Sequence, residues 1–301
     1  MRRDKAIGTL MQAIVSGLLL GGVYSLIAIG LTMVFGVVRI INFAHGELLM
    51  IAMYLTWLLN LWLGLDPYVA VLIVAPVMFV VGVAVQRGIV QPILGSPASM
   101  KIFATVGLSI ALQNLALMLF KGDFRTVQTS YSTAVMRIGG LSISTPRLVA
   151  FFVAVALAGG FFLFLKRTLV GKALRALAED RDAAALMGIP VRRLYVLAFG
   201  LGTGLVGVAG ALLIPVFYTF PTVGQLFGLT AFVVVVLGGL GSMPGAMVGG
   251  LIIGVVESLS GVYIAPALKE AVYFLLFIVV LLVRPQGLFG LGRGTEEVGL
   301  K

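Results

Sequence analysis

Two polar interruptions of long apolar stretches contain the residues of this 301-residue chain that are best placed to do chemistry. The first, at 39–47, holds the only histidine, His45, together with Asn42 and Glu47. Unpaired polar groups are costly in hydrocarbon, and irregular backbone at membrane depth is tolerated only where it is buried in protein or lines a cavity. These side chains are therefore either paired structural elements or the lining of a pathway.

The structural interpretation is an interfacial turn in which Asn42 caps a helix and Glu47 lies in its first turn, favoured by the helix dipole. A metal site is disfavoured, because one His and one Glu without further ligands are too few. The pathway interpretation uses both interruptions. The residues predicted to line a substrate pathway are Asn42, Phe43, His45, Glu47, Pro221 and Gln225.

The second interruption, at 220–226, reads Phe-Pro-Thr-Val-Gly-Gln-Leu and precedes an apolar run, as the first one does. Corresponding breaks in the two halves of a chain suggest an inverted repeat with a central pathway between the halves. Glu257 is a further acid inside an apolar run. We expect it near the membrane interface.

The third polar segment, 166–193, is the most charged part of the chain and holds seven basic residues. Leu174 and Leu177 share one face of a helix there, and Arg175 and Glu179 are spaced to pair four residues apart. Mixed charge around an apolar face is typical of a surface that docks a soluble partner. The alternative is a solvated connector.

A short helix over 183–187 is predicted in the same segment, with Asp182 as its cap and Gly188 followed by Pro190 as its end. Leu186 would then be a third apolar anchor beside the two leucines of the preceding helix. The residues predicted to couple this segment to a partner are Leu174, Arg175, Leu177, Glu179, Asp180, Leu186 and Gly188.

The elements that position these residues are membrane spans. The chain is 60% hydrophobic and 11% charged, whereas soluble domains carry about 25% charged residues. Since a span needs about 20 apolar residues, we predict an all-α polytopic membrane protein of eight or nine helices with broken or re-entrant segments, forming one domain over 1–301. The apolar runs are 7–37, 48–63, 68–85, 102–120, 148–165, 194–217, 229–240, 246–259 and 271–283.

The stretch 229–259 is interrupted by a glycine-rich piece at 238–245, so it is either two short spans or one broken helix. The connection 86–101, with two prolines, is expected to be long, and the polar connection 121–147 is expected to hold strand or irregular structure. Small residues four apart let helix backbones approach closely and predict a tight bundle. Such pairs are Gly17/Gly21, Gly200/Gly204, Gly245/Gly249 and Gly250/Gly254.

The formal charge of +10 resides in short loops between the apolar runs, which indicates positive-inside anchoring rather than nucleic-acid binding. That rule places 166–193 in the cytoplasm. Five spans precede this segment, so we predict an N-terminus on the outside and a cytoplasmic segment from Arg284 onward. The first apolar stretch is too long for a cleavable signal peptide.

Signals of catalysis are missing. The sequence 171–173 lacks the glycine spacing and the Ser/Thr of a P-loop, and no Gly-x-Ser-x-Gly or His-Glu-x-x-His pattern occurs. The absence of Cys excludes disulfides and Cys-metal sites. We therefore predict a protein that is not an enzyme and needs no cofactor of its own; energy for active transport would come from another subunit or an ion gradient.

Three blocks of sequence together resemble the LivH-type permeases of branched-chain amino-acid ABC importers. The first block is 21–36 with 41–47, the second is Arg-Ala-Leu-Ala-Glu-Asp at 175–180 with Gly188, and the third is 236–246, Val-Leu-Gly-Gly-Leu-Gly-Ser-Met-Pro-Gly-Ala. The likeness covers nearly the whole chain. Segment 166–193 matches the coupling region of that family but departs from the Glu-Ala-Ala loop signature of other importers.

The resemblance implies the fold of the LivH/LivM and ribose-permease class and a place in the inner membrane of the cell. It also implies a second permease subunit, identical or paralogous, two cytoplasmic ATPase subunits that bind the ATP, and an external substrate-binding protein. Leucine, isoleucine and valine are the expected cargo; relatives carry urea, amides or other amino acids. A secondary transporter driven by an ion gradient is the alternative from another class, and a membrane enzyme is disfavoured.

Overall fold

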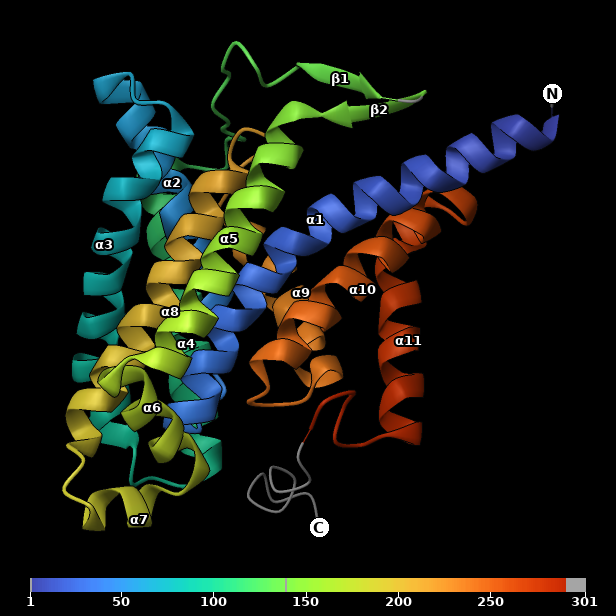
Figure 1. The fold of residues 1–301 in the computed structure, drawn as a ribbon. Helices are drawn as coiled ribbons and strands as arrows, with labels where there is room; N and C mark the ends of the chain where they lie inside the picture. Colours follow the sequence, from blue (N-terminus) through green and yellow to red (C-terminus); the bar gives the residue numbers. More distant parts are fainter. Residues whose placement is uncertain (1, 139, 291–301) are drawn as a thin grey trace.

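The structure is a computed structural model that describes residues 2–138 and 140–290, and it is built almost entirely of helices (Figure 1). The α-helices are α1 (Arg2–Val38), α2 (His45–Leu63), α3 (Pro67–Val85), α4 (Ala98–Phe120), α5 (Thr145–Arg167), α6 (Leu169–Glu179), α7 (Arg181–Leu186), α8 (Val191–Leu213), α9 (Val223–Gly238), α10 (Met243–Tyr263) and α11 (Lys269–Val283). Shorter helical pieces are η1 (Gln86–Val90), η2 (Gln91–Ile93) and η3 (Pro266–Leu268).

Eight helices in the described part of the chain are long and apolar enough to cross a membrane. They are α1, α2, α3 with its extension to Ile93, α4, α5, α8, α10 and α11 with η3. The remaining apolar helix, α9, is shorter, with 16 residues. The prediction of an all-α polytopic membrane protein is confirmed, and the stretch 229–259 forms two helices joined by a tight turn at 239–242 rather than one broken helix.

Two connections between spans differ in how well they were predicted. The 86–101 connection is shorter than expected, because helical backbone continues through a π-helical turn and a 3-10 turn to Ile93. The strand structure expected within 121–147 is present as the antiparallel hairpin of β1 (Val135–Ile138) and β2 (Leu141–Ser144), which pairs Val135 with Ser144. Burial raises the pKa of Tyr131, just before the hairpin, whose hydroxyl donates to Asp66 Oδ2 at 2.5 Å.

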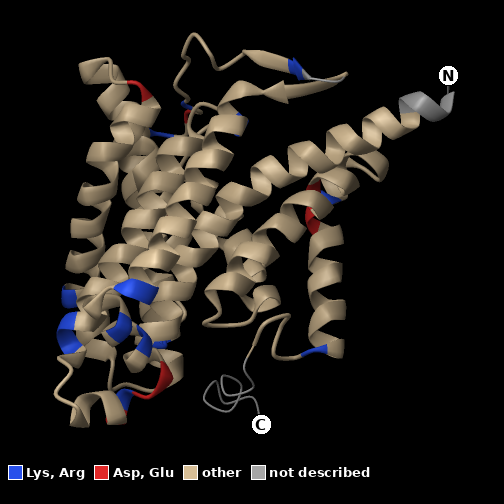
Figure 2. Ribbon diagram, in the orientation of Figure 1, with Lys and Arg blue, Asp and Glu red and all other residues tan. Residues whose placement is uncertain are grey.

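Basic residues gather at one end of the bundle. Lys and Arg are concentrated around α6, α7 and the helix ends beside them, whereas α1 begins at the opposite end (Figure 2). Five spans precede α6, and α11 ends on the basic side (Figure 1). The start of α1 and the basic segment therefore lie at opposite ends of the bundle; that the basic end faces the cytoplasm stays a prediction of the positive-inside rule.

The two halves of the chain pack in a reciprocal way. Helices α1, α2 and α3 of the first half correspond to α8, α9 and α10 of the second half. The first helix of each half packs along the third helix of the other: α1 runs against α10, and α8 runs against α3. The second helices, α2 and α9, contact each other, and α1 contacts α8 at the centre. This exchange is the one that an inverted repeat produces, as the corresponding breaks in the sequence suggested. α1 and α8 are accordingly the most buried spans, and α11 is the least buried.

The contacts between these helices depend on glycine. A Cβ added at Gly21 would lie 2.7 Å from the carbonyl oxygen of Gly250, and one added at Gly254 would lie 2.5 Å from Gly21 Cα. At the centre, a Cβ at Gly202 would lie 2.6 Å from the carbonyl oxygen of Gly30. Backbones therefore touch directly where α1 crosses α10 and α8, and the close packing expected from the glycine pairs is present.

Gly254→Val should weaken the bundle, because its side chain would have to push α10 away from α1. Overpacking of this kind costs about 1–3 kcal/mol. The matched control is Gly261→Val on the same helix, where an added Cβ meets nothing within 4 Å. Thermal unfolding in detergent measures both variants; an equal loss of Tm in the two would contradict the assignment of this crossing.

Candidate functional site

The first polar interruption turns back into the bundle after α1. Arg39 has φ 55, in the left-handed region, and reverses the chain direction. The segment 40–44 then leads to His45, whose Nε2 lies 3.1 Å from the carbonyl oxygen of Ile27, well inside α1. Helix α2 therefore begins in the interior of the bundle and not at its surface, so the predicted interfacial location of 39–47 is wrong, although Glu47 lies in the first turn of the helix as predicted.

The second polar interruption likewise turns back into the bundle, after the end of α8. The segment 214–222 leaves the end of α8, pairs with the backbone of Arg125 through Thr219, and leads to α9 at Val223. The first turns of α2 and α9 then meet: a Cβ added at Gly224 would lie 2.7 Å from the carbonyl oxygen of Gly46. The two sequence breaks thus bring two helix N-termini together inside the protein.

A chain of polar side chains starts at this junction. Gln113 on α4 donates from Nε2 to Glu47 Oε1 at 2.7 Å, and its own Oε1 accepts from Gln225 Nε2 at 3.2 Å. Glu47 is buried, and its Oε2 has no partner in the described part of the chain. Gln113 and Pro221 line a cavity of about 330 Å³ between α4 and the 220–222 loop. The structure therefore brings Glu47, Gln225 and Pro221 to one place.

The other predicted pathway residues have different surroundings. Asn42 is buried and accepts from the backbone N–H of Ala44 at 3.1 Å, so it forms a local turn and does not cap the first turn of α2. His45 is buried against Ile27. Phe43 stacks on Phe232 of α9 and is 42% exposed. Of the six predicted pathway residues, only Pro221 lines the 330 Å³ cavity; Glu47 and Gln225 reach it through their hydrogen bonds to Gln113.

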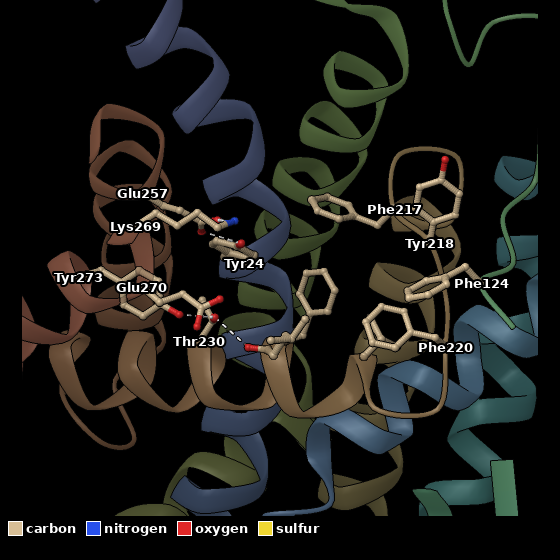
Figure 3. A pocket seen from close by; sticks show the side chains of 13 residues that line it. Tyr24, Phe124, Phe217, Tyr218, Phe220, Thr230, Glu257, Lys269, Glu270 and Tyr273 are labelled. Atoms are coloured by element: carbon tan, nitrogen blue, oxygen red, sulfur yellow. Dashed lines mark hydrogen bonds and ion pairs between the residues drawn. The ribbon is translucent and has the colours of Figure 1, made fainter. Parts of the chain in front are cut away.

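A second cavity was not predicted from the sequence. It has a volume of about 170 Å³ and lies between α1, α9, α10, α11 and the 217–220 loop (Figure 3). We call it the aromatic chamber. Its lining residues are Tyr24, Phe124, Phe217, Tyr218, Phe220, Val223, Leu226, Phe227, Thr230, Glu257, Lys269, Glu270 and Tyr273.

An ion pair closes one end of the aromatic chamber. Lys269 Nζ lies 2.7 Å from Glu257 Oε1, and the hydroxyl of Tyr24 donates to Glu257 Oε2 at 2.7 Å. Glu257 is only 7% exposed, so it is buried and paired rather than left at a solvated interface. The sequence offered one signal here, an acid in an apolar run. Its two partners are 233 and 12 residues away along the chain.

The basic segment 166–193 holds two short helices, α6 and α7, joined by a sharp turn. Asp180 accepts from the backbone N–H groups of Asp182 and Ala183 at 2.9 and 3.0 Å, so it caps α7. The prediction that Asp182 is the cap is wrong by two residues, because the helix begins at Arg181. Gly188 has φ 78 and ends the short helix, as predicted.

Only part of the predicted docking face is available to a partner. Leu174 and Leu177 are each 1% exposed, because α6 lays its apolar face on the chain's own helices. Their predicted role as surface anchors is therefore wrong. Leu186 is 89% exposed and Met187 is 82% exposed, so these two side chains project from α7.

Polar contacts hold the basic segment 166–193 on the spans. Arg175 donates from Nε to the carbonyl oxygen of Leu165 at 3.0 Å, at the end of α5. Arg39, at the end of α1, donates to the carbonyl oxygen of Ala178 at 3.3 Å. The segment is therefore fixed to α1 and α5, and α7 is its outermost part (Figure 1).

These features define a multi-pass membrane protein with a polar, cavity-bearing interior and a helical segment presented at its basic end. Residues 13–281 match the family described as the branched-chain amino acid transport system / permease component. The chain belongs to this family. No solved structure matches the chain.

Curated relatives span almost the full length. The high-affinity branched-chain amino acid transport system permease protein LivH of Salmonella typhimurium is 35% identical over 297 residues, which cover 93% of this chain and 95% of the relative. BraD of Pseudomonas aeruginosa, with the same description, is 35% identical over 93% of this chain and 95% of its own length. The ribose import permease RbsC of Bacillus subtilis is 28% identical over 59% of this chain and 54% of its own length.

Gln113→Leu should destabilise the folded chain, because it removes the donor to a buried carboxyl oxygen of Glu47. Leaving such a group unsatisfied costs about 1–3 kcal/mol. The adjacent Asn114→Leu is the control, since Asn114 is exposed and its one side-chain hydrogen bond among the described residues goes to Ile110 on its own helix. Thermal unfolding followed by circular dichroism compares the two. An Asn114 variant that loses as much stability as the Gln113 variant would count against the polar chain.

Proposed function

We propose that this chain is the membrane-spanning permease subunit of an ABC importer in the inner membrane and that it translocates leucine, isoleucine and valine. The observation that carries this is its 35% identity, over 93% of the chain, to permeases named for branched-chain amino acid transport. Eight candidate spans support a transport role. Residues 1–301 would act as one transmembrane domain, with 166–193 as its cytoplasmic coupling segment.

The remaining subunits are those that the family implies. With no nucleotide-binding motif in the sequence, ATP would be bound by two cytoplasmic ATPase subunits and not by this chain. An external binding protein would deliver the amino acid, and a second permease subunit, identical or paralogous, would complete the membrane part. In this scheme the chain is not itself an enzyme and holds no cofactor.

The proposed pathway passes the junction of α2 and α9. Helices that begin inside a bundle direct their free N–H groups and positive dipole ends at that point, and transporters use such ends to hold anionic groups of a substrate. The chain Glu47–Gln113–Gln225 adds donors and acceptors beside the 330 Å³ cavity. Asn42, Phe43 and His45 would support the junction from the segment that leads into α2.

Coupling to the ATPases would occur at α7. Buried apolar anchors usually dominate the energy of an interface, and charges at the rim mainly tune encounter. Leu186, with Met187 beside it, is an exposed apolar group on α7, and Leu169 at the start of α6 is another in the same segment. Leu174, Leu177 and Arg175 would fix α6 to the spans, so that a force on α7 reaches α1 and α5. Asp180 and Gly188 would set the direction of α7, and Glu179 lies at the join.

Uptake in proteoliposomes tests the cargo. The complex with its ATPases, second permease and binding protein should accumulate labelled leucine only with ATP inside and binding protein outside, and isoleucine and valine should compete. Competition by urea or an amide, without competition by leucine, would show that the cargo is another substrate of the same family. Uptake driven by an ion gradient without ATPases would make the chain a secondary transporter.

Leu186→Asp should uncouple transport while the bundle stays inserted. Loss of one anchor costs about 1–3 kcal/mol, or roughly 5- to 150-fold in association with the ATPase subunits. Pull-down of the ATPases and binding-protein-stimulated ATP hydrolysis measure the effect. Val135→Asp, an exposed position on the hairpin at the opposite end, is the control. Normal pull-down of the Leu186 variant would place docking at another cytoplasmic segment, such as the 86–101 connection.

A further inference from the structure

The aromatic chamber has two chemically different ends. Figure 3 shows Glu257, Lys269 and Glu270 gathered on one side and Phe124 and Phe220 on the other, with Tyr24 and Thr230 between them. Its polar end comes from α10 and α11, and its aromatic end comes from the loops before α9 and after α4. A ligand that fits both ends must carry charge at one end and an apolar group at the other.

The charged groups at the polar end are only partly paired with each other. Both carboxyl oxygens of Glu257 are engaged, one by Tyr24 and one by Lys269. The ammonium of Lys269 has three donors, of which the described residues occupy one, and its side chain is 40% exposed. Glu270 is exposed, and no other described side chain forms an ion pair or hydrogen bond with it. A cation and an anion on consecutive residues therefore remain available at the chamber.

The aromatic end suits an aliphatic group. Phe217 packs edge-on against Phe227 with ring centroids 5.5 Å apart, and Phe124 packs against Phe220 at 4.8 Å. The chamber volume is about 170 Å³. An apolar cavity of ~150 Å³ holds a molecule as large as benzene. The side chain of leucine, isoleucine or valine is no larger than benzene, so it fits within the chamber.

We propose that the aromatic chamber is a transient binding site for a zwitterionic amino acid with an aliphatic side chain. Lys269 would hold its carboxylate and Glu270 its ammonium, while Phe217 and Phe220 would contact its side chain. Glu257 positions Lys269 and is itself held by Tyr24. The choice of an amino acid as the ligand rests on the proposed function. The site would make the permease itself selective, in addition to any external binding protein.

The lack of cysteine in the chain makes a direct test available. Leu226→Cys places the chain's only thiol in the chamber lining, at a position that is 46% exposed. In the assembled importer without binding protein, labelling by a methanethiosulfonate reagent is followed by mass spectrometry of this chain. Leucine should slow the labelling several-fold. Isoamylamine, which lacks the carboxylate, and 4-methylpentanoate, which lacks the amine, should protect much less.

Matched positions and variants separate binding from structure. Val135→Cys on the hairpin should be labelled at the same rate with and without leucine. Glu270→Gln breaks no bond found among the described residues, so in the Leu226→Cys background it should abolish protection without lowering Tm. Lys269→Gln should also abolish protection, and Lys269→Arg should restore part of it. Full protection by leucine in the Glu270 and Lys269 variants would overturn the proposal.

The same assay distinguishes failure of this site from failure of the proposed function. If the wild-type complex takes up leucine but leucine does not protect the Leu226→Cys variant, the chamber is not the binding site and the permease assignment stands. A complex that takes up no branched-chain amino acid, and whose chamber thiol is not protected by leucine, would remove the cargo assignment and with it the ligand proposed here.

Discussion

Direct contact between helix backbones is the constraint on which the rest of this structure depends. Lipid is as apolar as a leucine side chain, so helices associate through close packing and hydrogen bonds rather than through a hydrophobic driving force. Gly21 and Gly254 provide such contact between α1 and α10, and Gly30 and Gly202 provide it between α1 and α8. These crossings place α1 and α8 at the centre and leave α4 and α11 on the outside.

A central pair of long helices leaves space for shorter ones to begin inside. Both α2 and α9 start within the bundle, after segments that turn back from the ends of α1 and α8. Water is absent at that depth, so the free groups there need protein partners or a cavity. Gln113 supplies a partner to Oε1 of Glu47 and itself lines the cavity, whereas Oε2 of Glu47 is buried without a partner among the described residues. The inverted arrangement thus produces the polar interior as a consequence of packing.

One helix connects the aromatic chamber with the basic segment 166–193. On α1, Tyr24 donates to Glu257 in the aromatic chamber, and Arg39 at the end of the same helix donates to Ala178 on α6. These two residues are separated by roughly 22 Å along the helix axis, at 1.5 Å per residue. The chamber and α6 are therefore both bonded to the same helix, α1.

The sequence by itself determined the spans, the two interruptions, the hairpin region and the family resemblance, because hydropathy, turn residues and short motifs are local. It placed Glu47, Pro221 and Gln225 in one functional group, but it could not show that Gln113 joins them. Tertiary structure alone decided that Tyr24, Glu257 and Lys269 meet, since 233 residues separate the first two. It also decided that Leu174 and Leu177 are buried. An amphipathic helix requires an apolar surface, and its sequence is the same whether that surface belongs to its own chain or to a partner.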